Sequence, residues 1–150
     1  MRRGLVRAVK VLGLTLALSI VLAAVAPSAQ ATWHPRAEML SWMNQARGRH
    51  GAVELDSVRR LRELANVHSQ QMAYEGRIFH TEQLSARLRI VSWSVAGENV
   101  GVGPRLWALY DAFMKSDVHR DNILERRFQR VGIGVYRADG FLWITLIFVG

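Results

Sequence analysis

The chain has 150 residues, no cysteine, a formal net charge of +8, and a hydrophobic share of 50%. This length allows one domain, and the lack of cysteine excludes a scaffold held together by disulfides. Four basic residues and no acid lie in residues 1–31, so residues 32–150 have a surplus of only +4 (8 − 4). Such a surplus is too small to indicate nucleic-acid binding.

Residues 1–31 have the pattern of an export signal. A basic start is followed by the apolar run 11–26 and by an Ala-x-Ala motif that ends at Ala31. We therefore predict a signal peptide over 1–31 and a secreted domain over 32–150, with no membrane span after cleavage. The alternative is an uncleaved anchor, although a membrane-spanning helix needs about 20 apolar residues.

Apolar residues at helical spacing predict three helices in the exported domain. Pro35 suits the first turn of the first helix. The second helix is expected to start at Asp56 or Ser57, both good N-caps, and to end near Gly76. The third helix follows Pro104. The expected apolar stripes are Met39, Leu40, Met43 and Ala46; Val58, Leu61, Ala65, His68 and Met72; and Leu106, Trp107, Tyr110, Phe113 and Met114.

The C-terminal part of the chain predicts strands. Residues 130–137 and 141–150 are apolar segments joined by the turn signal Ala-Asp-Gly, so we expect an antiparallel pair. The second segment is apolar on both faces and must be covered on both sides. A third short strand is expected within 94–102, and a short helix within 82–88. The predicted fold class is α+β: an α/β/α sandwich in which helices cover both faces of a small antiparallel sheet.

The glycine-rich stretch "AGENVGVGP" lacks both common phosphate-binding patterns. No Gly-Lys-Ser/Thr follows Gly97, and Leu106 stands where a dinucleotide fingerprint needs its third glycine. The remaining candidate for chemistry in this stretch is its acid, Glu98. Two histidines outside the apolar stripes, His80 and His119, would complete a His₂Glu set with an open position, which zinc accepts. Spacing alone also allows these residues to lie apart.

The other three histidines have simpler interpretations. His34 lies beside the predicted cleavage site and His50 in a turn, so both are expected in solvent. His68 falls on the apolar stripe of the second helix. We expect it to be a core histidine that is hydrogen-bonded to the backbone.

Five blocks of this sequence resemble the CAP superfamily, which comprises cysteine-rich secretory proteins, antigen 5 and pathogenesis-related 1 proteins. They are similar to its short bacterial branch, follow the family order, and cover essentially all of residues 36–150. The Gly-Glu-Asn tripeptide and the Ser-x-x-His-Arg-x-Asn-Ile-Leu block are the most specific together. The blocks are "MNQARGRHG", "LRELANVHSQQMAYEGRIFHTEQL", "WSVAGENV", "FMKSDVHRDNILERRFQRVGIGVYR" and "WITLIFVG".

The resemblance implies an α/β/α sandwich with a central cleft lined by two histidines and two acids. His80 and His119 match the histidines, and Glu98 matches the first acid. Ser116 stands at the position of the second acid, which weakens the case for tight divalent binding.

The resemblance also assigns roles to the neighbours of Glu98. Gly97 is expected to let the backbone turn tightly beneath the acid, and Asn99 to hydrogen-bond the loop backbone. The predicted cleft lining is Ser116, Asn99 and Thr145.

Three functions are consistent with these residues. The leading one is a monomeric, non-catalytic binding domain, at the cell surface or in the medium, whose cleft holds a divalent metal such as zinc or a small apolar or lipid ligand. Its expected partners are a lipid, a cell-wall polymer or a host surface, and not nucleic acid. The second is a hydrolase that uses Ser116, His119 and Glu98 as a triad, or a water activated by a metal on His80 and His119. The third is a polar cluster that only rigidifies the fold.

Overall fold

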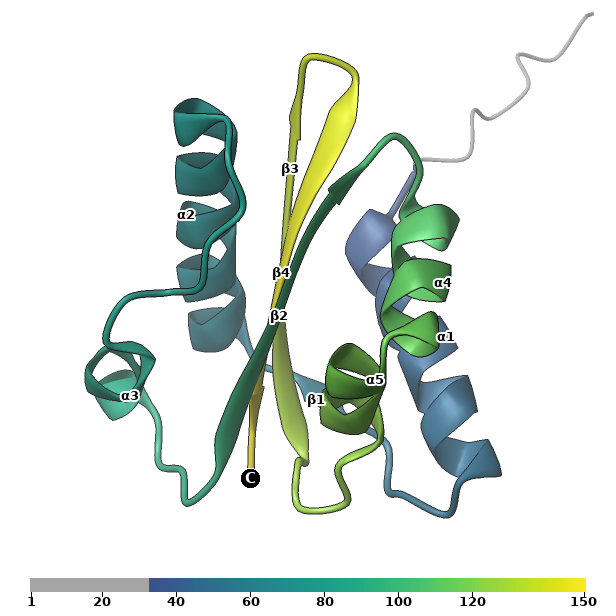
Figure 1. Cartoon of the computed structure of the whole chain (residues 1–150). Coiled ribbons are helices and arrows are strands. Elements are labelled where there is room, and N and C mark those ends of the chain that lie inside the picture. The colour runs from purple at the N-terminus through teal and green to yellow at the C-terminus, as the bar shows by residue number, and fades with distance from the viewer. Residues whose placement is uncertain (1–32) are drawn as a thin grey trace, which may run out of the picture. The chain divides into compact units, whose positions relative to one another are not determined.

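The computed structural model describes residues 33–150, in which one sheet lies between two layers of helices (Figure 1). One layer contains α2 and the short α3, and the other contains α1, α4 and α5. The predicted sandwich is therefore confirmed, while the predicted signal peptide lies outside the described residues. The helices are α1 (Pro35–Arg49), α2 (Arg59–Glu75), α3 (Leu84–Arg87), the 3₁₀ turn η1 (Leu88–Ile90), α4 (Leu106–Lys115) and α5 (Asp117–Leu124).

The sheet has four strands in the order β1-β3-β4-β2. The three longer strands are antiparallel, as predicted, whereas the short β1 runs parallel to β3 and makes the sheet mixed. At the β3–β4 turn Asp139 and Gly140 have φ of 49° and 79°, the left-handed pair that suits a tight hairpin. The strands are β1 (Asp56–Ser57), β2 (Ala96–Gly103), β3 (Arg130–Ala138) and β4 (Phe141–Val149).

Strand β4 lies at the centre of the core and is covered on both faces, as its continuous apolar sequence predicts. Alternate side chains from Leu142 to Phe148 pack with α1 and α4, while Ile147 and Val149 pack against α2. Both hydrophobic clusters and all four strands lie within 33–150. Residues 32–150 therefore form a compact unit with a core of its own, and we expect this unit to fold without the segment before it.

The second helix begins later than its capping signals predict. Val58 is the N-cap residue of α2, and Asp56 and Ser57 form β1 instead. The backbone N–H groups of Asp56 and Val58 donate to Gln129 and Val131 at 2.9 and 3.0 Å, so pairing with β3 determines the local structure. The predicted end is confirmed, because Gly76 caps α2 with φ of 65°.

Helix α2 approaches the sheet very closely. A Cβ atom added at Gly132 or Gly134 of β3 would collide with the α2 backbone at Leu61 or Ala65. The two glycines therefore determine the spacing between this helix and the sheet. Any side chain there would push away the helix that contains His68.

The predicted apolar face of α4 needs one correction. Leu106 and Phe113 are buried as expected, and Leu109 is buried between them, but Trp107 is 55% exposed. Position 107 is turned about 100° from position 106 on a helix, so it misses the face that meets the sheet. Within residues 33–150, no helix combines the length and the apolarity needed to cross a bilayer.

Candidate functional site

Glu98 is the centre of a buried polar arrangement on β2. Its side chain is only 4% exposed. The carboxylate accepts the Thr81 N–H at 2.9 Å on Oε2 and the Thr81 hydroxyl at 2.8 Å on Oε1. Two imidazoles adjoin it: His68 Nδ1 lies 3.5 Å from Oε1, and His80 Nδ1 lies 3.5 Å from Oε2. The acid is therefore held by Thr81 and shared between two histidines.

Gly97 serves this arrangement by allowing close packing. It lies inside β2, outside the left-handed region, so the predicted tight turn is wrong. A Cβ atom there would lie 2.8 Å from Asn122 Oδ1 and 2.9 Å from Phe128 Cζ. The missing side chain lets α5 and the segment after it pack against the strand that contains Glu98.

His119 is positioned by hydrogen bonds that join α5 to β2. Its Nδ1 lies 2.8 Å from Ser116 Oγ, and its ring packs against Phe113 at a centroid distance of 5.2 Å. Asn99 Nδ2 donates to the His119 carbonyl at 2.9 Å, and Asn122 Nδ2 donates to Asn99 Oδ1 at 2.9 Å. Asn99 does bond to the backbone, but to α5 rather than to its own segment.

Burial lowers the pKa of His119, and the nearby His80 lowers it further because two positive imidazoles repel each other. The neutral form of His119 is thereby favoured near pH 7. His34 and His50 are exposed, as predicted.

His68 is the residue whose role the sequence analysis missed. It lies in the core as expected, but its partners are side chains: Nδ1 lies 3.1 Å from Thr145 Oγ1, which also accepts the Ser69 hydroxyl at 3.0 Å. The prediction of a backbone partner is therefore wrong. Within residues 33–150, His68 Nε2 is buried and has no hydrogen-bond partner. Burial lowers the pKa of His68, and the negative charge of Glu98 opposes this shift.

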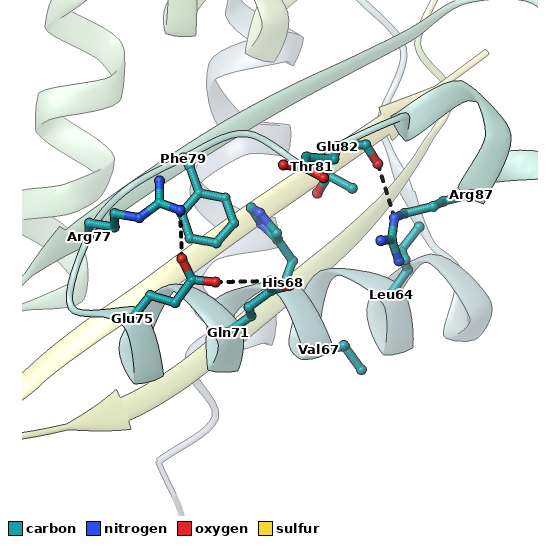
Figure 2. Close-up of a pocket in the computed structure, with 10 residues that line it drawn as sticks. All are labelled: Leu64, Val67, His68, Gln71, Glu75, Arg77, Phe79, Thr81, Glu82 and Arg87. Carbon is teal, nitrogen blue, oxygen red and sulfur yellow. Dashed lines mark hydrogen bonds and ion pairs between the residues drawn. The ribbon is translucent and has the colours of Figure 1, made fainter.

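A small cavity lies beside His68, between α2 and residues 77–87 (Figure 2). Its volume is about 80 Å³, and both His68 and Thr81 contribute to its wall. Figure 2 shows the His68 ring directed from α2 toward this segment, and the ring meets Phe79 edge-on at a centroid distance of 5.1 Å. The cavity therefore lies on the α2 side of the sheet, and Glu98 is not part of its wall.

The structure divides the candidate site into two pairs, and the two residues of each pair are in contact. His80 adjoins Glu98, and Ser116 adjoins His119, but Glu98 has no hydrogen bond or ion pair with His119 among the described residues. The hypothetical triad is therefore not assembled. In the part of the chain that the structure describes, no three histidine or acidic side chains have the spacing of a metal site. Tertiary packing brings Thr81 to Glu98 and Asn122 to Asn99. Thr81 follows His80 in the sequence, and Asn122 is the asparagine of the Ser-x-x-His-Arg-x-Asn-Ile-Leu block.

Residues 40–148 match the CAP family, described as the cysteine-rich secretory protein family. This match spans most of the chain and agrees with the sheet, the flanking helices and the Gly-Glu-Asn strand. The chain belongs to the CAP family. No curated protein sequence matches it significantly.

Solved structures show the same fold. An extracellular protein containing an SCP domain from Bacillus anthracis is 26% identical, with a TM-score of 0.68 over 75% of this chain and 39% of that one. A cysteine-rich secretory protein from Staphylococcus aureus is 23% identical, with a TM-score of 0.67 over 77% and 38%. An outer surface protein from Borrelia burgdorferi is 15% identical, with a TM-score of 0.70 over 77% and 91%. The chain thus spans about two fifths of the first two proteins.

Proposed function

We propose that this protein is a non-catalytic binding domain that acts outside the cytoplasm and holds a divalent cation at a polar cluster. The cluster consists of His80, Glu98, Ser116 and His119. The Bacillus anthracis relative is described as extracellular and the Borrelia burgdorferi one as an outer surface protein, which supports export. Lipid, wall-polymer and host-surface partners stay predictions.

One observation supports cation binding above all. The Nδ1 atom of each histidine faces an oxygen of the protein: Glu98 Oε2 at 3.5 Å for His80, and Ser116 Oγ at 2.8 Å for His119. Such partners orient an imidazole and leave its Nε2 atom for a metal. The neutral form of His119 that burial favours is also the form that binds metal.

The geometry changes the role proposed for Glu98. Both of its oxygens already accept hydrogen bonds from Thr81, so it is better placed to orient His80 than to serve as a third ligand. The His80 side chain is 65% exposed and is accessible from solvent. We therefore propose two imidazole ligands, with water or a bound partner completing the coordination. Such a site would exchange its metal readily.

Thermal melts with zinc test this proposal. A hundredfold excess over the dissociation constant stabilises a protein by about 2.7 kcal/mol. Zinc should therefore raise the melting temperature at pH 7.5 and do much less at pH 5.5, where protonated imidazoles cannot ligate. His80→Ala and His119→Ala should each abolish the gain.

His50→Ala is the matched control, because His50 is exposed at the end of α1. The His50→Ala variant should retain the full rise in melting temperature with zinc. A wild type that gains nothing at pH 7.5, or an equal loss in His50→Ala, would favour the purely structural role of the cluster.

A hydrolase remains a second candidate on one observation, the 2.8 Å contact between Ser116 Oγ and His119 Nδ1. A serine nucleophile also needs a group that orients the histidine and donors that stabilise an oxyanion. Glu98 is engaged with Thr81, His68 and His80 instead. We therefore propose no reaction for this site.

A further inference from the structure

Exposed aromatic side chains gather at one end of the domain. Figure 1 shows that α1 and α4 begin, and the β3–β4 hairpin turns, at this same end. Trp33 lies two residues before the start of α1, Trp107 lies in the first turn of α4, and Tyr136 and Phe141 flank the hairpin turn. Their exposed fractions are 48%, 55%, 38% and 47%, respectively. We call these four residues the aromatic end.

Part of this end is a shallow groove. Trp33 and Trp107 line a space of about 250 Å³ together with Arg105 and Arg137. The Arg137 guanidinium lies 4.9 Å from the centre of the Trp33 ring, and Trp33 Nε1 donates to the Glu38 carboxylate at 3.2 Å. These contacts hold an exposed indole in a defined place, although no core packing requires it there.

We propose that the aromatic end docks on a phospholipid membrane surface. Tryptophan and tyrosine favour the boundary between lipid and water, because their rings are apolar and their polar edges stay hydrated. Arg105 and Arg137 can donate to lipid phosphate groups beside the rings. Glu38 in the groove and Asp139 in the adjoining turn are acidic, so attraction depends on direct contact rather than on a long-range field.

Hairpin geometry favours a flat surface over a small ligand in the groove. Arg137 is paired with Leu142, which also lines the groove. Successive side chains of a strand point to opposite faces, so Tyr136 and Phe141 project on the other side of the hairpin. A membrane contacts both faces of a protruding hairpin tip at once, whereas a glycan stacked in the groove contacts only one face.

For a chain that keeps residues 1–31 as an anchor, chain connectivity gives independent support. Residues 27–32 alone separate the apolar run 11–26 from Trp33. Six extended residues reach about 20 Å at most. Whenever that run resides in a bilayer, Trp33 therefore lies within this reach of the membrane. This inference goes beyond the proposed cation site and does not depend on it.

Vesicle binding by residues 32–150 tests the inference. Wild type should sediment with vesicles of equal phosphatidylglycerol and phosphatidylcholine, and brominated lipid should quench its tryptophan fluorescence. The double variant Trp33→Ala, Trp107→Ala should lose about ten-fold or more in partitioning, because membrane binding scales with buried apolar area. Arg105→Ser should weaken binding by a smaller factor. His80→Ala, with or without zinc, should bind like wild type.

Trp93→Ala is the matched control. Trp93 is 37% exposed, and its neighbour Ser94 bonds to Gly150 at 2.8 Å, at the opposite end of the sheet from the hairpin turn. This variant should bind vesicles like wild type. An absence of wild-type binding, or an equal loss in Trp93→Ala, would overturn the inference. So would quenching by soluble cell-wall glycan fragments without vesicle binding, because a glycan would then be the occupant.

Discussion

Two buried polar arrangements in this domain differ in how completely their hydrogen bonds are satisfied. Arg47 has no exposed surface, and its guanidinium donates to four backbone carbonyls at 2.7 to 3.0 Å. The acceptors are the carbonyls of Val53, Ile123, Glu125 and Phe128. The arrangement joins α1 to the end of α5 and offers nothing to a ligand.

The cluster around Glu98 is buried at its centre but incomplete at its edges. His68 Nε2 lacks a partner among the described residues, and the His80 side chain is 65% exposed. A buried charged group in which every polar atom has a partner rigidifies a fold, whereas a cluster with an unpartnered atom and an exposed edge can still bind. The comparison supports a structural role for Arg47 and is consistent with the binding role proposed above for His80, Glu98, Ser116 and His119.

The largest expected effect comes from breaking the saturated arrangement. Arg47→Met should lower the free energy of unfolding by about 3 kcal/mol or more, because it leaves buried carbonyls without donors. The melting temperature should fall by about 10 °C. Urea denaturation measures the loss. Arg49→Met, on the exposed side of the same helix turn, is the control, and a similar loss in both would remove the special role of Arg47.

Glu98→Gln should lower the free energy of unfolding by a smaller amount, about 1 to 2 kcal/mol. The amide oxygen can still accept from Thr81, but the charge beside the two histidines is lost. The same variant should reduce the zinc gain, because His80 loses its orienting partner. Glu75→Gln changes an exposed ion pair with Arg77 and should have little effect in either assay. Unchanged zinc stabilisation in Glu98→Gln would contradict the orienting role.

A pH titration should separate the two arrangements. Burial lowers the folded-state pKa of His68 and His119 below their ordinary value of 6.5. The unfolded chain then binds protons more tightly than the folded chain does. The stability that the two neutral histidines contribute is therefore present above about pH 6.5, and it is lost as the pH falls through their folded-state pKa values. Urea midpoints in metal-free buffer from pH 8 to 5 should show this decline. His119→Asn should flatten it, whereas Arg47 has no titration in this range.

The smallest effect is expected at Ser116. Ser116→Ala removes one half-buried hydrogen bond to His119 and should cost about 0.5 to 1 kcal/mol. No ester or peptide hydrolysis is expected in wild type, so the variant should remove none. A reproducible wild-type turnover that disappears in Ser116→Ala would establish the hydrolase alternative.

The sequence alone determined much of this protein. Helical spacing predicted α1, α2 and α4, and the continuous apolar run of β4 predicted a sheet that is covered on both faces. Local signals were enough for these elements because each depends on short-range periodicity or on turn residues such as Asp139-Gly140 and Gly76. The family resemblance singled out His80, Glu98 and His119, whose role as a cation site stays a prediction.

Only the tertiary structure decided which residues contact one another. Asp56 and Ser57 have good capping chemistry, but pairing with β3 satisfies their backbone better. Gly97 looks like a turn residue, yet it is required by the approach of Asn122 and Phe128 from distant segments. His68 meets Glu98 because the α2 spacing is determined by glycines some seventy residues later in the chain. These outcomes depend on long-range packing, which periodicity and motif spacing do not encode.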